Sequence, residues 1–153
     1  MKIGEALSED CIRIELESQT REDVIRVLVD ELEKTGSYQN SDVVFKAVLE
    51  RERIMTTGVG NGIAIPHCKH ESCSEFKIAL GILNHAVDFS AIDGQPVNIV
   101  FLLIGPNNTA GNHIKLLSRI SRLVNNSDVR DKIRSFTSEK DVFDFLLEKE
   151  ALI

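Results

Sequence analysis

The sequence predicts a single α/β domain with helices layered against a central sheet. Amphipathic segments with helical periodicity alternate along the chain with short apolar runs of strand character, as in layered α/β proteins. The chain has 153 residues, of which 42% are hydrophobic, and a domain of this size buries roughly 68–70% of its unfolded surface. We therefore expect residues 1–153 to share one hydrophobic core, without repeats or an internal linker.

The N-terminal third predicts a strand followed by two helices. Residues 11–16 alternate imperfectly between polar and apolar side chains and indicate a short strand. Thr20 begins a capping-box pattern for a helix that stops near Gly36. Ser41 is the expected N-cap of a second amphipathic helix. The end of that helix brings Arg51 to the start of the next segment.

A glycine-rich loop and a short strand are expected next. Residues 56–62 contain three glycines and predict a loop in which a ligand can approach the backbone closely. Residues 63–65 are apolar and predict a buried strand. Pro66 should end this strand, because proline cannot donate to a ladder. His67 is then displayed at the strand tip, where functional side chains are common.

The remaining strands are expected in the middle of the chain. Residues 76–83 form one apolar run, and residues 85–96 have the mixed polar composition of turns. Residues 97–104 are almost all β-branched or large and apolar. Such a run is typical of a central strand that is covered on both faces.

The C-terminal third predicts three helices. A polar loop over 106–112 leads into a helix over 112–124, with His113 in its first turn and on its buried face. Ser127 and Ser138 are the expected N-caps of two further helices.

The charge balance argues against nucleic acid as a direct ligand. The chain carries 24 acidic and 18 basic residues, a formal net charge of -6. Lysines and arginines do not gather into the basic patch that nucleic-acid binding requires. The acidic excess favours docking to a basic partner surface instead.

The cysteines and the apolar runs indicate a cytoplasmic protein. Cys11, Cys68 and Cys73 are an odd number in a chain long enough to fold without disulfides, so we expect reduced thiols. The N-terminus contains charges and no apolar run, which argues against a signal peptide. The longest apolar run, 99–104, is far shorter than the about 20 residues of a membrane helix, so direct membrane insertion is not expected.

One stretch, residues 51–70, concentrates the side chains that phosphoryl chemistry requires. Its sequence is RERIMTTGVGNGIAIPHCKH. His67 is the best-placed nucleophile, because a neutral imidazole attacks without a separate strong base. The alternative is a structural histidine at a strand end.

A phosphorylated histidine needs cationic and amide donors around the added negative charge. The expected donors are the side chains of Arg51, Thr56, Thr57 and His113, the helix-start amides at 111–113, and the loop that holds Gly58, Gly60 and Asn61. His113 also fits a helix-capping or half-buried role, and Asn61 between glycines fits ordinary turn chemistry.

Other chemistries fit the stretch less well. The cluster His67, Cys68, His70 and Cys73 invites a zinc site, but its spacing matches no recognised zinc pattern. A Cys68 nucleophile is disfavoured because adjacent strand residues point to opposite faces. The glycines lack the lysine of a P-loop and precede a strand, which argues against nucleotide cofactors.

The run TTGVGNGIAIPH, from Thr56 to His67, resembles the phosphoacceptor signature of enzyme IIA domains. These domains belong to the bacterial phosphoenolpyruvate-dependent phosphotransferase system, in its fructose, mannitol and nitrogen-regulatory branch. The resemblance extends to the pair Arg51 and Glu52, to VDFSAIDGQPVNIVFLL and to NHIKLLSRIS, and so covers nearly the whole chain.

The resemblance implies a phosphocarrier. His67 would accept a phosphoryl group, with Nε2 favoured, from HPr or its nitrogen-branch counterpart, while His113 hydrogen-bonds the site and Arg51 supplies positive charge. The family's fold is a mixed sheet with helices on both sides, and its members need no metal or bound cofactor. Recipients would be an enzyme IIB or a regulatory target. The absence of attached IIB or IIC segments favours the regulatory role over sugar transport.

The chain departs from the family pattern beside the phosphoacceptor. Cys68 stands where the family usually has glycine, and residues 72–74 read SCS in place of more ordinary polar residues. A side chain at position 68 narrows backbone approach to the phosphoryl group. We still expect the transfer chemistry to survive.

Overall fold

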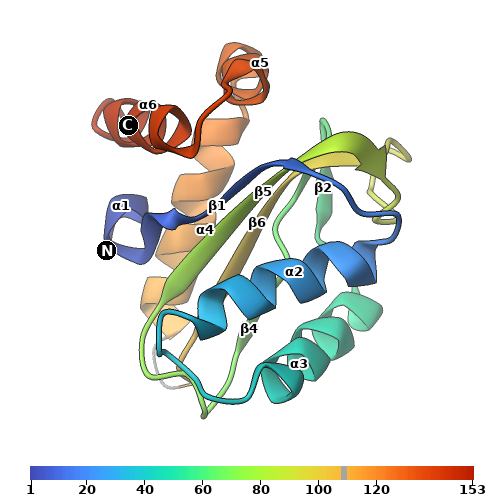
Figure 1. The fold of residues 1–153 in the computed structure, drawn as a ribbon, viewed down its shortest axis with the longest axis vertical. Coiled ribbons are helices and arrows are strands. Elements are labelled where there is room, and N and C mark those ends of the chain that lie inside the picture. The colour runs from blue at the N-terminus through green and yellow to red at the C-terminus, as the bar shows by residue number, and fades with distance from the viewer. Residues whose placement is uncertain (108–109) are drawn as a thin grey trace.

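The computed structural model describes residues 1–107 and 110–153, which form a mixed sheet flanked by helices (Figure 1). The strands are β1 (Leu7–Leu16), β2 (Gly58–Gly60), β3 (Ile63–Ala64), β4 (His67–Lys69), β5 (Lys77–Val87) and β6 (Val97–Gly105). The helices are α1 (Ile3–Ala6), α2 (Arg21–Glu33), α3 (Ser41–Ile54), α4 (Ala110–Val124), α5 (Ser127–Ser135) and α6 (Glu139–Glu150).

The sheet is organised around β6, which contacts three other strands. The strand order is β1-β5-β6-β3-β2, and β4 also pairs with β6. Strand β5 is antiparallel to β6, whereas β3 and β4 run parallel to it one after the other. Short β3 and β4 therefore follow the same edge of β6, and the chain between them stays against the sheet.

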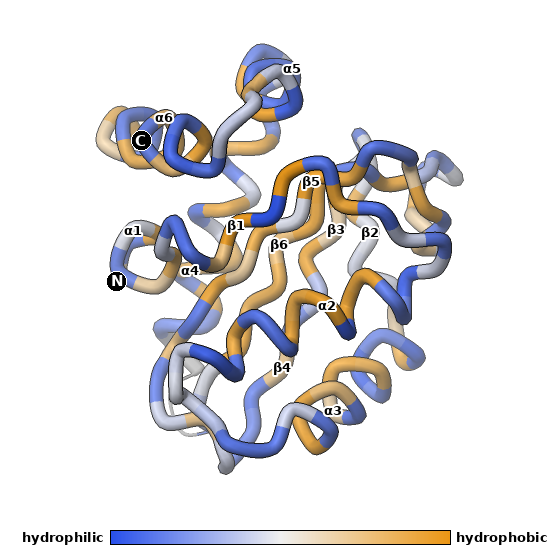
Figure 2. Tube along the Cα trace, in the orientation of Figure 1, coloured by the Kyte–Doolittle hydropathy of each residue, from blue (hydrophilic) through white to orange (hydrophobic). Residues whose placement is uncertain are grey.

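Helices cover both faces of this sheet, which confirms the predicted fold class. In Figure 1, α2 and α3 lie on one face, and α4 lies on the other with α1, α5 and α6 near it. Strand β6 alternates accordingly: Ile99, Phe101 and Leu103 join the core under α4, and Val100, Leu102 and Ile104 join the core under α2 and α3. Figure 2 shows the apolar residues concentrated in these central strands. The run 97–104 is the doubly covered strand that its composition predicted.

The predicted N-cap residue is confirmed for two helices, and for two others the N-cap lies one residue earlier than predicted. Thr20 and Ser138 cap α2 and α6 by accepting from the backbone N–H three residues on. The predictions of Ser41 and Ser127 as N-caps were wrong. Asn40 and Asn126 hold the cap positions, with extended backbone and side chains that accept helix N–H groups. Asparagine and serine cap equally well, so adjacent pairs are ambiguous from sequence.

Several strand boundaries also differ from the prediction. Strands β1 and β5 are longer than expected, and the loop over 56–62 contains the short strand β2, which pairs with β3. Strand β3 ends at Ala64, one residue earlier than predicted. Helix α4 begins at Ala110, within the loop predicted over 106–112, and residues 108–109 of that loop lie outside the described residues.

Across the part of the chain that the structure describes, every helix is too short or too polar to cross a lipid bilayer.

A buried carboxylate ties the N-terminal turn to the C-terminal helices. Glu150 is 4% exposed and accepts hydrogen bonds from the backbone N–H groups of Ile3 and Gly4 and from Arg119 Nε, at 2.6, 3.2 and 2.9 Å. Burial alone would raise the pKa of Glu150, but these donors outweigh it and hold the pKa below its usual value.

Glu150→Ala should therefore lower the free energy of unfolding by about 2–4 kcal/mol near neutral pH, since it leaves buried donors unpaired. Because the folded-state pKa of Glu150 is depressed, the stabilisation exists above the unfolded pKa of about 4.3 and disappears as pH falls through the folded value. Urea denaturation at neutral and acidic pH measures both effects. Exposed Glu148→Ala is the matched control. Equal losses in the two variants would contradict this role.

Candidate functional site

The sequence predicted that His67 stands at the tip of a strand that ends at Pro66. In the structure, His67 instead begins a further strand, β4. Pro66 interrupts the ladder only briefly, because its carbonyl oxygen accepts the Leu103 N–H at 3.0 Å. Pairing with β6 then resumes, with His67 opposite Leu103. The backbone at His67 is thus held by the central strand of the sheet.

A backbone carbonyl fixes the imidazole of His67. Its Nδ1 lies 2.7 Å from the carbonyl oxygen of Ile65. A carbonyl oxygen only accepts hydrogen bonds, so Nδ1 carries the proton in this contact. In the neutral ring, the lone pair is therefore on Nε2. The half-buried ring presents that nitrogen as the nucleophile.

His113 faces His67 from the first turn of α4. The centroids of the two rings are 5.2 Å apart and their planes are tilted by 59°. His113 is 5% exposed, on the buried side of the helix as its spacing predicted, and Phe76 lies 6.3 Å from it on another side. Among the described residues, Nδ1 of His113 is a buried atom without a hydrogen-bond partner.

Both histidines are neutral near pH 7. Burial lowers the pKa of His67 below 6.5, helped by the charges of Arg51 and Lys69 and opposed by the Ile65 carbonyl and Glu52. Burial, together with the neighbouring His67, lowers the pKa of His113 to about 4. The site thus holds one neutral nucleophile and one neutral hydrogen-bonding ring.

The two rings share an open cavity of about 570 Å³ with cationic side chains. Arg51 is at the end of α3, where its Nη1 donates to the carbonyl oxygen of Met55 at 3.1 Å. The residues that line the cavity are Ala47, Glu50, Arg51, Ile54, His67, Cys68, Lys69, His70, Asn107 and His113. An anion in this cavity would meet Arg51 and Lys69 as well as the rings.

The five residues predicted to bind the phosphoryl group through the glycine-rich loop lie outside this cavity. Thr56 donates its hydroxyl to the Phe89 carbonyl and accepts the N–H of Gly58. Thr57 is buried, and both its N–H and its hydroxyl donate to the carboxylate of Glu52.

The glycine end of the loop is engaged with Asp93. The N–H of Asn61 donates to Asp93 Oδ2 at 3.0 Å. A Cβ at Gly60 would stand 3.2 Å from the same oxygen, and its φ of +99° favours glycine in any case. Gly60 and Asn61 line a separate hollow of about 170 Å³. Gly60 is therefore part of a tight turn that packs closely against Asp93.

Sequence reasoning missed two charged residues near the site. Lys69 lines the cavity two positions after His67 on β4. Glu52 appeared only as part of the family pair, yet it is 3% exposed and holds Thr57. The alternation of strand residues could have indicated Lys69, because positions 67 and 69 share one face.

The thiols do not form the metal site that was considered as an alternative. Cys11, Cys68 and Cys73 are free and buried, and burial raises the pKa of Cys68 to about 12, which disfavours the thiolate. Within the described residues, no group of three or more His, Cys, Asp or Glu side chains is placed to hold a metal ion.

Comparison with known proteins gives concordant matches over nearly the whole chain. The family model described as phosphoenolpyruvate-dependent sugar phosphotransferase system, EIIA 2, matches residues 5–149. A PTS system fructose-specific EIIABC component of Bacillus subtilis is 35% identical over 95% of this chain, which spans only 23% of that protein. A nitrogen regulatory protein of Bradyrhizobium diazoefficiens is 33% identical over 95% of both chains. The crystal structure of nitrogen regulatory protein IIA-Ntr from Neisseria meningitidis matches with a TM-score of 0.89 at 29% identity, covering 94% of this chain and 98% of that one.

Proposed function

Since the chain belongs to the enzyme IIA family of the phosphoenolpyruvate-dependent sugar phosphotransferase system, we propose that it is a phosphocarrier that accepts a phosphoryl group on His67. The donor is phosphorylated HPr or its nitrogen-branch counterpart. The observation that carries the proposal is the pair of neutral imidazoles, 5.2 Å apart, at one cationic cavity.

The transfer step uses the tautomer that Ile65 selects. The Nε2 lone pair of His67 attacks the phosphorus in line, the bond from phosphorus to the donor imidazole nitrogen breaks, and that electron pair returns to the donor ring. The His67 ring gains positive charge as the new bond forms. The Ile65 carbonyl at Nδ1–H stabilises that charge without removing the proton.

His113 acts as a hydrogen-bond donor to the phosphoryl oxygens. A buried N–H without a partner is rarer in proteins than an unpaired acceptor, so Nδ1 of His113 is assigned the lone pair. The proton is then on Nε2, and the ring donates it toward the cavity. In the unphosphorylated protein, a pKa of about 4 keeps this ring uncharged near neutral pH.

Thr57 positions His67 indirectly. Glu52 holds the N–H and the hydroxyl of Thr57, and the Thr57 carbonyl accepts the Ile65 N–H at 3.0 Å. Ile65 in turn orients the His67 ring. We assign this supporting role to the glycine-rich segment, since direct contact of Thr56, Gly58, Gly60 or Asn61 with a phosphoryl group would require the segment to leave its present partners.

Arg51 compensates the phosphoryl charge. Arg51→Gln should slow phosphoryl uptake by about tenfold, because a charge-assisted donor at a partly exposed site is lost. The matched control is Arg53→Gln on the same helix, outside the residues that line the cavity. The rate of phosphate incorporation from labelled phosphoenolpyruvate checks both. A control variant as slow as Arg51→Gln would mean that only net charge matters.

Apolar side chains beside the cavity provide a docking surface for the partner proteins. Ile54, Met55 and Ile114 are 80%, 65% and 66% exposed. Ile54 lines the cavity, and Ile114 follows His113 in the sequence. Exposed apolar groups around a reactive centre are typical of protein interfaces.

Three free thiols are consistent with the cytoplasm as the compartment.

Incubation with phosphoenolpyruvate, enzyme I and HPr, or their nitrogen-branch counterparts, tests the function. The intact mass should rise by one phosphoryl group, and an unchanged mass with all donors supplied would refute the proposal. The regulatory role is the first candidate, supported by 33% identity to the nitrogen regulatory protein and by the TM-score of 0.89 to nitrogen regulatory protein IIA-Ntr.

Sugar transport through an enzyme IIB is the second candidate, supported by 35% identity to the fructose-specific protein. Transfer of the phosphoryl group to a purified fructose-type IIB would favour sugar transport. Phosphorylation-dependent capture of a regulatory target would favour the regulatory role.

A further inference from the structure

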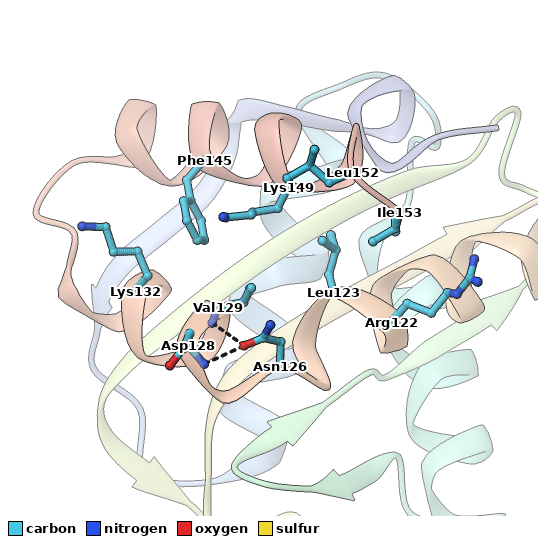
Figure 3. A pocket seen from close by; sticks show the side chains of 10 residues that line it. All are labelled: Arg122, Leu123, Asn126, Asp128, Val129, Lys132, Phe145, Lys149, Leu152 and Ile153. Carbon is cyan, nitrogen blue, oxygen red and sulfur yellow. Dashed lines mark hydrogen bonds between the residues drawn. The ribbon is translucent and has the colours of Figure 1, made fainter.

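A second cavity, of about 480 Å³, lies where α4, α5, α6 and the last residues of the chain meet (Figure 3). Its volume falls within the range of small-molecule sites, roughly 300–1,000 Å³. Leu123 on this wall lies ten residues after His113 on α4, about 15 Å at 1.5 Å per residue. The cavity is therefore separate from the phosphoryl site.

The larger part of the surface of this cavity is apolar. Leu123 and Val129 are buried behind it, and the half-buried ring of Phe145 forms another wall. Leu152 and Ile153 extend along it while remaining 74% and 44% exposed. An alkyl chain bound here would contact side chains from all three helices and cover part of this exposed apolar surface.

Three cations line this apolar surface, and none of them forms an ion pair with a carboxylate among the described residues. Lys132 and Lys149 have their Nζ atoms over the rings of Phe136 and Phe145, at 5.4 and 5.6 Å, and Arg122 stands on the opposite wall (Figure 3). One acid, Asp128, also lines the cavity. Among the side chains that line the cavity, cations thus outnumber carboxylates by three to one, on a chain whose formal net charge is -6.

Neighbouring cations on the same helices behave differently. Arg119 pairs with Glu150, Arg134 with Asp131, and Lys140 with Asp144. Lys115 and Arg130 on these helices also form no ion pair among the described residues, so Arg122, Lys132 and Lys149 are distinguished by their position at the apolar cavity. This arrangement matches a ligand with an apolar body and an anionic end.

From this geometry we propose that the cavity binds a small organic anion with an aliphatic chain, of the medium-chain carboxylate type. The chain packs on Leu123, Val129 and Phe145, and the carboxylate is held by Lys149, while Lys132 and Arg122 add positive charge at the two ends of the cavity. This binding site is independent of phosphoryl transfer, so it can be tested on the unphosphorylated protein.

Titration of nitrogen-15-labelled protein with decanoate tests the proposal. Saturable amide shifts are expected at α5 and α6 around the cavity. Decanol has the chain without the charge, and acetate has the charge without the chain; each should bind at least tenfold more weakly than decanoate. An absence of saturable shifts with decanoate, or equal binding of decanol, would overturn the proposal.

Two lysines on α6 provide a matched pair of variants. Lys149→Gln should weaken decanoate binding about fivefold to tenfold, whereas Lys140→Gln, whose partner is Asp144 outside the cavity, should leave it unchanged. Leu152→Ser should weaken binding without loss of charge. Equal weakening by Lys140→Gln and Lys149→Gln would mean that binding depends only on the net charge of the protein. That result would contradict a specific binding site at the cavity.

Discussion

Replacement of His67 by alanine is expected to abolish phosphoryl uptake from HPr-type donors. The variant lacks the Nε2 lone pair that the Ile65 carbonyl exposes by holding the proton on Nδ1. Loss of a nucleophile removes the covalent step itself, so incorporation should fall below detection rather than slow by a modest factor. Intact-mass measurement after incubation with phosphoenolpyruvate and the donor proteins checks this.

A second histidine supplies the control for that experiment. His85 is exposed on β5 and does not line the phosphoryl cavity, so His85→Ala should incorporate one phosphoryl group at the unaltered rate. Thermal unfolding of both variants excludes a loss of fold as the cause. Full incorporation in His67→Ala would place the phosphoacceptor elsewhere and contradict the assignment.

His113→Phe is expected to slow phosphoryl uptake by about 10²–10³-fold, the range seen when one preorganised donor to a developing charge is removed. Phenylalanine keeps a ring beside Phe76 but offers no hydrogen bond, so the chemistry changes more than the packing. Rapid-quench measurement of the transfer rate gives the effect. His113→Asn restores a polar N–H donor and should recover part of the rate.

The comparison of these two variants separates hydrogen bonding from packing. If Phe and Asn variants were equally slow, the imidazole would act through its shape. A wild-type rate in His113→Phe would show that His113 takes no part, despite its ring lying 5.2 Å from that of His67.

Patterns that depend on local residues were predictable from the sequence. The apolar run of β6 indicated a strand covered on both faces, because every second residue must then be apolar on each face. The helical spacing after His113 placed its side chain on the buried face, which the structure confirms. Family resemblance then linked His113 to His67 across 46 positions of sequence.

Features that depend on distant partners were not predictable. The glycine-rich segment had the composition of an anion cradle, but its polar groups are engaged by Phe89 and Asp93, which lie more than thirty positions away. The pairing of the chain with β6 on both sides of Pro66 was not predictable for the same reason. Proline removes one N–H donor, yet its carbonyl still accepts from Leu103, so β4 continues along β6.

In the proposed mechanism, one phosphoryl group is bound to Nε2 of His67, between two facing imidazoles. Nitrogen-15 NMR of histidine-labelled, phosphorylated protein tests it directly, because phosphorus coupling identifies the bonded ring nitrogen. We expect coupling at Nε2 of His67 and a retained Nδ1–H on the same ring. Phosphorus on Nδ1, or on any other histidine, would contradict the account.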